Sequence, residues 1–133
     1  MTVKLIVADD PQTVAPAGAV VVPVSSHIRR KREFFGVMKR HLRRLHLYSD
    51  NWDALYDALR DLSSLTDVPC VVLRHTGLPF APDSRQREIY LEFLSGLLAD
   101  GGTTPELWIV VPATESAAIS HLRSAAEPSP PRT

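Results

Sequence analysis

The sequence has little of what several common protein classes depend on. It holds one cysteine, Cys70, in 133 residues, so it can form neither an internal disulfide nor a cysteine-rich zinc site, and a reducing cytoplasm is its expected location. The longest apolar run, Leu107–Ala113, is far shorter than the roughly 20 residues of a membrane-spanning helix. Asp9, Asp10 and Pro11 break the first apolar stretch, and we expect no secretory signal.

An excess of one charge and the usual catalytic motifs are also missing. Fifteen Lys and Arg balance fifteen Asp and Glu, which argues against a globally basic nucleic-acid binder. The sequence contains no glycine-rich phosphate loop and no G-x-S-x-G nucleophile turn. Its five histidines are scattered, and we interpret them as solvated helix side chains and Cys70 as a buried structural thiol. We therefore expect no catalytic residue, no metal site and no cofactor.

The sequence does contain short apolar runs that alternate with longer amphipathic segments. The short runs predict buried strands, and apolar residues three or four positions apart predict helices. The strands are predicted at 19–24, 70–73 and 107–111, with Val3–Ala8 as a candidate fourth, and the helices at 27–46, 51–62 and 84–99. Buried strands separated by helices indicate an α/β fold. We predict a small three-layer fold in which helices flank a parallel sheet of three or four strands.

The two ends of the chain differ from the middle. Residues 1–18 are predicted as an N-terminal extension that can add one strand, and residues 19–113 as the main domain. Residues 114–133 are predicted as a weak helix followed by a tail, which the Pro-Ser-Pro-Pro run at 128–131 marks as disordered.

The segment 48–62 is strongly acidic. Its acids are Asp50, Asp53, Asp57 and Asp61, and its one base is Arg60. Asp53 and Asp57 are four residues apart and so share one helix face, and we expect them and Tyr56 to point away from the leucine stripe. Such a face is either simply solvated or a surface that imitates phosphates and docks on a basic groove.

The preceding segment, His27–His46, is strongly basic. Eight Lys and Arg stand against Glu33 alone, a formal charge of eight minus one, or +7. The segment is either a solvated helix face or a footprint for nucleic acid or an acidic partner. No aromatic residues interleave with the charges on its outer face, which argues against single-strand binding.

The acidic segment carries a recognisable motif. Asn51-Trp52-Asp53-Ala54-Leu55, followed by Asp57, Leu59, Asp61 and Leu62, resembles the signature of the barstar family of small intracellular inhibitors of barnase-type ribonucleases. In that family the acidic helix and the loop before it enter the ribonuclease active site, where the acids take the place of substrate phosphates. The order of strands and helices over about 19–111 is also similar. Three positions depart from the family pattern: Leu47 replaces an aromatic residue, Ser49 replaces a glycine, and Ser95-Gly96 lacks a glutamate.

The resemblance implies a function and a set of contact residues. We predict a non-catalytic inhibitor of the immunity or antitoxin type, monomeric when free, whose partner is a basic ribonuclease. The predicted partner-binding residues are Tyr48, Asp50, Asn51, Trp52, Asp53, Tyr56 and Asp57. Trp52 also falls on the leucine stripe, so core packing is an alternative role for it. The alternatives for the whole protein are an interaction or regulatory module with a non-nuclease partner, and a nucleic-acid binder acting through the basic helix 27–46.

Overall fold

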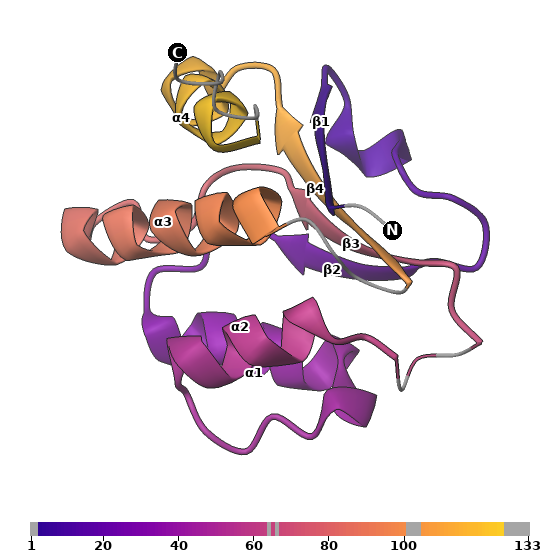
Figure 1. The fold of residues 1–133 in the computed structure, drawn as a ribbon. Coiled ribbons are helices and arrows are strands. Elements are labelled where there is room, and N and C mark those ends of the chain that lie inside the picture. The colour runs from indigo at the N-terminus through magenta and orange to yellow at the C-terminus, as the bar shows by residue number, and fades with distance from the viewer. Residues whose placement is uncertain (1–2, 64, 66, 101–104, 127–133) are drawn as a thin grey trace, which may run out of the picture.

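A parallel four-stranded sheet organises the molecule (Figure 1). The computed structural model describes residues 3–63, 65, 67–100 and 105–126. The strands are β1 (Val3–Ala8), β2 (Val20–Val24), β3 (Cys70–His75) and β4 (Glu106–Pro112), in the order β1-β4-β3-β2. The helices are α1 (Lys31–His41), α2 (Trp52–Arg60), α3 (Ser84–Asp100) and α4 (Ser116–Ala126), with short 3-10 turns η1 (Pro11–Thr13) and η2 (Arg43–Leu45). The predicted α/β fold is confirmed, and its sheet has four strands.

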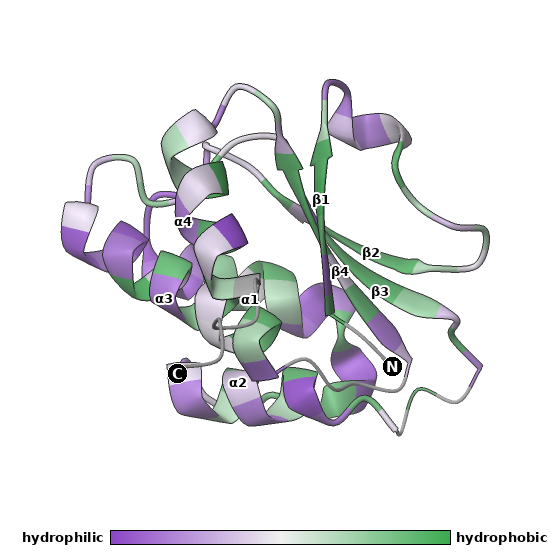
Figure 2. Ribbon diagram, turned by 45° about the horizontal axis from the view of Figure 1, so that its top comes forward, coloured by the Kyte–Doolittle hydropathy of each residue, from purple (hydrophilic) through white to green (hydrophobic). Residues whose placement is uncertain are grey.

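The two faces of the sheet are covered differently. Strand side chains alternate between faces, so Val71 and Leu73 belong to the large core cluster while Val72 lies in a smaller one on the opposite face. All four helices contribute buried side chains to the large cluster. The opposite face is packed instead by the loop that carries η1, through Val14 and Ala19. Figure 2 shows the strands as the most continuously hydrophobic elements.

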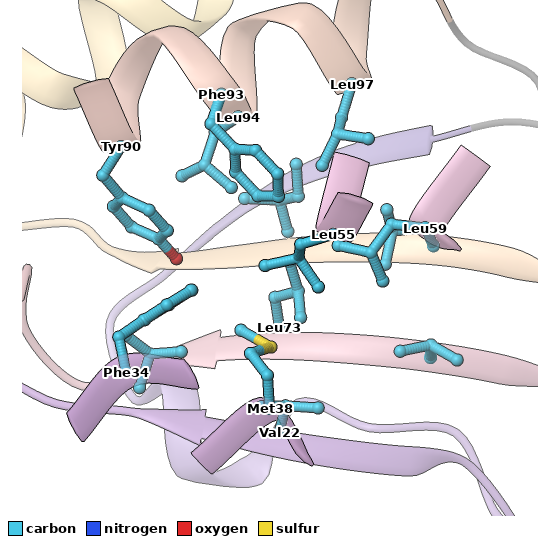
Figure 3. Close-up of a cluster of buried hydrophobic side chains, with 14 of the residues drawn as sticks. Val22, Phe34, Met38, Leu55, Leu59, Leu73, Tyr90, Phe93, Leu94 and Leu97 are labelled. Atoms are coloured by element: carbon cyan, nitrogen blue, oxygen red, sulfur yellow. The ribbon is translucent and has the colours of Figure 1, made fainter. Parts of the chain in front are cut away.

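The large core cluster holds α1, α2 and α3 together against the sheet. Figure 3 shows the leucines of α2, Leu55 and Leu59, between side chains of α3 and of β3, and both are completely buried. Phe34 and Met38 of α1 are buried in the same cluster. The face of α2 that carries these leucines is therefore fixed, and the opposite face of α2 is turned to solvent.

The first helix is shorter than the sequence predicts. Ser25 and Ser26 stand just before the predicted helix 27–46 and are of a residue type that caps helices. However, α1 begins at Lys31, and its N-cap residue Arg30 makes no side-chain capping bond. The Ser25 hydroxyl oxygen instead accepts a hydrogen bond from the His27 backbone N–H at 3.2 Å, within a turn. After α1 the chain tightens into η2, which ends at His46 in the left-handed region, at φ 52°.

Both flanks of the main domain join the same sheet and core. β1 pairs with β4 over six positions, and the Ala113 backbone N–H donates to the Ala8 carbonyl oxygen at 2.9 Å. α4 packs on α3 and β1, and its Ile119 and Leu122 are buried. The predicted disordered tail at 127–133 lies outside the described residues.

One histidine contradicts its interpretation as a solvated helix side chain. His75 lies at the end of β3 and is completely buried. Its Nδ1 donates to the Val110 carbonyl oxygen at 2.8 Å, which leaves Nε2 to accept from the Tyr90 hydroxyl at 2.5 Å. Burial lowers the pKa of His75 to about 4. Because Tyr90 is far away in sequence, nothing near His75 in the chain indicates this partner.

This buried pair predicts acid sensitivity. His75 in the folded protein takes up its proton near pH 4, whereas an unfolded histidine does so near pH 6.5. The unfolded state therefore binds more protons between these values, and stability should be complete above pH 6.5 and fall by about 3 kcal/mol as the pH drops to 4. Denaturation curves across this range measure it. His75→Gln should remove most of this slope, and a wild-type His75 that titrates near 6.5 by NMR would contradict the prediction.

Candidate partner-binding site

The cap and the buried leucines of α2 together aim its acids at solvent. The Asn51 side chain accepts from the backbone N–H groups of Asp53 at 2.8 Å and Ala54 at 3.3 Å, and so fixes the start of the helix. Asp50 and Asn51 are both of residue types that cap helices, and the structure uses Asn51. With Leu55 on the core side, Asp53 and Asp57 are both exposed, one helical turn apart on the outer face.

The acids near α2 differ in whether the fold already uses them. Asp50 forms an ion pair with Lys39, with Nζ and Oδ1 2.8 Å apart. The Asp61 carboxylate accepts a hydrogen bond from the Ser63 backbone N–H at 3.1 Å, and the Asp100 carboxylate accepts one from the Tyr56 hydroxyl. Asp53 and Asp57 make no side-chain hydrogen bond or ion pair with any described residue. The fold therefore leaves these two carboxylates free for a partner and holds Asp50 by Lys39.

A shallow apolar groove of about 350 Å³ lies between α2 and α3, beside these acids. Its main lining residues are Trp52, Asp53 and Tyr56 from α2, and Ile89, Glu92 and Phe93 from α3. Glu92 is exposed and also lies 3.3 Å from His121. Glu92 is not evident from the family pattern, which points to Ser95-Gly96 for an acid on this helix. The signal available was its spacing of three from Ile89, which places both on one side of α3.

The sequence predicts that Tyr56 points away from the leucine stripe, but its side chain packs against α3 and the core cluster. The ring is half-buried and packs edge-on against Phe93, with centroids 6.0 Å apart. Its hydroxyl donates to the Asp100 carboxylate, and the Arg60 guanidinium lies 5.7 Å from the ring centroid. Burial, followed by the bond to Asp100, raises the pKa of Tyr56 to about 12. Tyr56 therefore presents a fixed ring, not a mobile one, as the wall of the groove.

Gly96 of α3 makes room for this ring. A Cβ atom at position 96 would lie 3.0 Å from Cε2 and 3.1 Å from the hydroxyl oxygen of Tyr56, which is tighter than normal packing. Asp100 and Phe93 hold the ring on its other sides, so it cannot withdraw easily. The small residue at 96 is therefore what allows α2 and α3 to approach here.

The two helical glycines provide a matched pair of substitutions. Gly36→Ala should stabilise the protein by about 1 kcal/mol, because alanine is the better helix former and position 36 has open space around it. Gly96→Ala gains the same propensity but overpacks Tyr56, at a cost of about 1–3 kcal/mol, so it should destabilise by about 1 kcal/mol. Chemical denaturation of both variants measures the two signs. Equal gains in both would show that Tyr56 yields freely.

Trp52 is mainly a core residue. Its ring lies 5.2 Å from that of Phe34, 5.1 Å from Phe35 and 5.3 Å from Phe93, measured between centroids. Its indole N–H is buried and has no hydrogen-bond partner among the described residues. The side chain is nonetheless half-buried, and one part of it lines the groove. The structure thus favours packing over partner contact for most of this ring.

Tyr48, unlike Trp52, is exposed to solvent. Its side chain is 87% exposed and is the one exposed large hydrophobic group in the described part of the chain. It stacks on His46, with ring centroids 6.1 Å apart and planes at 17°. Leu47, which replaces a family aromatic, turns inward and packs against the core cluster. The loop before α2 therefore offers one aromatic anchor of the kind that dominates protein interfaces.

The groups at this site are of the kinds that protein interfaces use. Among the described residues no cluster of His, Cys, Asp and Glu could hold a metal ion, and no helix there could span a membrane. Cys70 is buried on the other face of the sheet, and burial raises the pKa of its thiol to about 11, so it is not a reactive thiolate. The outer face of α2 offers two carboxylates that no described residue pairs, the loop before it offers the exposed ring of Tyr48, and an apolar groove lies between α2 and α3.

Comparison with known proteins identifies the family. The family model described as Barstar (barnase inhibitor) matches residues 19–112. The chain therefore belongs to the barstar family. The match spans β2 to β4 and includes the candidate site, whereas β1 and α4 lie outside it. No curated protein and no solved structure matches the chain.

Proposed function

We propose that this protein is a non-catalytic inhibitor that occludes the active site of a basic ribonuclease with the outer face of α2. Family membership supports the general class, since the family is described by barnase inhibition. The observation that carries the proposal for this chain is the state of Asp53 and Asp57: both are exposed and unpaired among the described residues, while the fold engages the neighbouring acids Asp50, Asp61 and Asp100.

The proposed mechanism is electrostatic imitation of RNA. Asp53 and Asp57 take the place of phosphates against the Arg, Lys and His side chains of the enzyme, and opposite charge speeds the encounter. Tyr48 supplies an apolar anchor, and the groove between α2 and α3, with Glu92 at its rim, accepts a cationic side chain against the Tyr56 ring. Asn51 fixes the start of α2, and the ion pair between Asp50 and Lys39 holds the loop before this helix on α1. The protein acts as a monomer in the cytoplasm.

The test captures the partner and assays it. The full chain, immobilised, should retain a basic protein from the native host, and that protein should cleave RNA until about one equivalent of this chain is added. The Asp53→Ala/Asp57→Ala double variant should retain none. Capture that depends on these acids but brings down a protein without nuclease activity would replace the ribonuclease by a regulatory partner on the same surface. RNA cleavage by the purified chain itself would contradict the non-catalytic assignment.

A further inference from the structure

A second charged surface remains outside the proposed inhibitory site. It is the outer face of α1 and the η2 turn, which we call the basic stripe: Arg32, Gly36, Arg40 and Arg43. All four are exposed, while Phe34, Phe35 and Met38 occupy the inner face of α1. Of the eight basic residues between 27 and 46, Lys39 and Arg44 are paired with Asp50 and Asp67. The three arginines of the stripe make no ion pair with any residue that the structure describes.

The residue in the middle of the α1 part of the stripe is a glycine, Gly36, which is unusual inside a helix. Glycine in a helix interior is less favourable than alanine, and a fold normally requires it only for close packing or a positive φ. Neither reason applies here: a Cβ atom at position 36 would meet nothing within 4 Å, and Gly36 is not among the positive-φ residues. The fold gains nothing from this glycine, whereas a bulky ligand lying across α1 would gain close access to its backbone.

The arginines at the end of the stripe converge on one space. Arg40 and Arg43 line a hollow of about 230 Å³, whose apolar floor includes Leu42, Leu65 and Val68. Arg40 and Arg43 can each contact one of two neighbouring phosphates at this end of the stripe. The carbonyl end of α1 is the less favourable end for an anion, but it carries only about half a charge, and two full positive charges outweigh it.

We propose that the basic stripe binds the phosphate backbone of double-stranded DNA. An acidic protein is a poorer match, because stable protein interfaces need apolar or aromatic anchors, and the apolar residues here are confined to the hollow beside Arg40 and Arg43. Single strands need exposed rings for stacking. Arg32 and Arg40 are eight residues apart, about 12 Å along the helix, which matches the roughly 12 Å width of the B-DNA major groove. The corresponding groove of A-form RNA is narrow and deep.

This geometry makes the binding independent of sequence and sensitive to salt. Because the inner face of α1 is packed on the core, only its outer face can settle into the mouth of the groove. Its arginines contact phosphates on both sides there, and Gly36 between them carries no side chain that would read bases or hold the helix away from the DNA. Three phosphate contacts predict a slope of log affinity against log salt of about −2.7, or about a 40-fold loss between about 50 mM and 200 mM. The acids of α2 remain available to a protein partner.

Fluorescence anisotropy with a labelled DNA duplex of about 20 base pairs, titrated with the full chain, tests the proposal. Arg32→Gln/Arg40→Gln should weaken binding at least tenfold and reduce the salt slope by about two. The matched control is Lys4→Gln/Arg123→Gln, which removes the same charge from β1 and α4 and should stay within about threefold of wild type. Gly36→Gln should raise the melting temperature yet weaken DNA binding about fivefold or more.

Four outcomes would overturn the proposal. Equal loss in the control variant would show an effect of net charge alone. Unchanged DNA binding by Gly36→Gln would show that the DNA does not lie close to the backbone of α1. Equal or tighter binding to an RNA duplex or to single strands would exclude DNA as the ligand. Preference for polyglutamate over DNA would assign the stripe to an acidic protein.

Discussion

Replacing Asp57 with alanine should weaken partner binding by about 2–5 kcal/mol, or about 30- to 5,000-fold, while leaving the free protein almost unchanged. In the complex this carboxylate faces cationic groups of the partner, and its removal leaves those charges desolvated and unpaired. In the free protein Asp57 is exposed and bonded to no described residue, so its loss should change the free energy of unfolding by less than about 0.5 kcal/mol. Titration calorimetry and denaturation curves measure the two effects.

The controls separate a specific contact from general electrostatics. Asp9→Ala removes the same charge from an exposed position in the turn after β1, well away from α2 (Figure 1), and should alter affinity by less than about threefold. Asp53→Ala should resemble Asp57→Ala but with a smaller effect, because Asp53 also lies in the first turn of α2, where it stabilises the helix N-terminus. If Asp57→Ala unfolds the protein yet binds normally once corrected for the folded fraction, the acid is structural and the proposed mechanism is wrong.

Replacing Leu59 with alanine should lower the stability of the protein and leave partner binding almost unchanged, the reverse of the effect expected for Asp57→Ala. Leu59 lies on the same helix but is completely buried in the core cluster between α3 and the sheet. Truncation removes apolar contacts and leaves a cavity, so the free energy of unfolding should fall by about 2–5 kcal/mol. Chemical denaturation gives this value directly, and affinity corrected for the folded fraction should stay near that of the wild type.

A volume-conserving substitution provides the comparison for Leu59. Leu59→Met keeps the side-chain volume and apolar character and should cost less than about 1.5 kcal/mol. Together, Asp57→Ala and Leu59→Ala separate binding from folding on two faces of one short helix. A Leu59→Ala protein of normal stability would show that α2 is loosely packed, and a rigid α2 face would then no longer explain the spacing of the two acids.

The sequence by itself determined the elements whose signals are local. Apolar runs located the strands, including β1 at Val3–Ala8, and leucine spacing located α2, because a helix needs one continuous apolar face. A cap at Asp50 or Asn51 and the shared face of Asp53 and Asp57 follow from the same local geometry, and the structure selects Asn51 as the cap. The motif of α2 also indicated the family, which the match over 19–112 confirms.

Tertiary structure alone decided which side chains meet across elements. His75 is buried because β4 and α3 bring Val110 and Tyr90 to it, and Tyr56 is fixed because Gly96 and Asp100 of α3 lie beside it. Likewise, α1 supplies Lys39 as an ion-pair partner for Asp50, whereas no described residue supplies one for Asp57. These contacts join residues far apart in the chain, and a carboxylate has the same local sequence signal whether or not packing later supplies it with a cation.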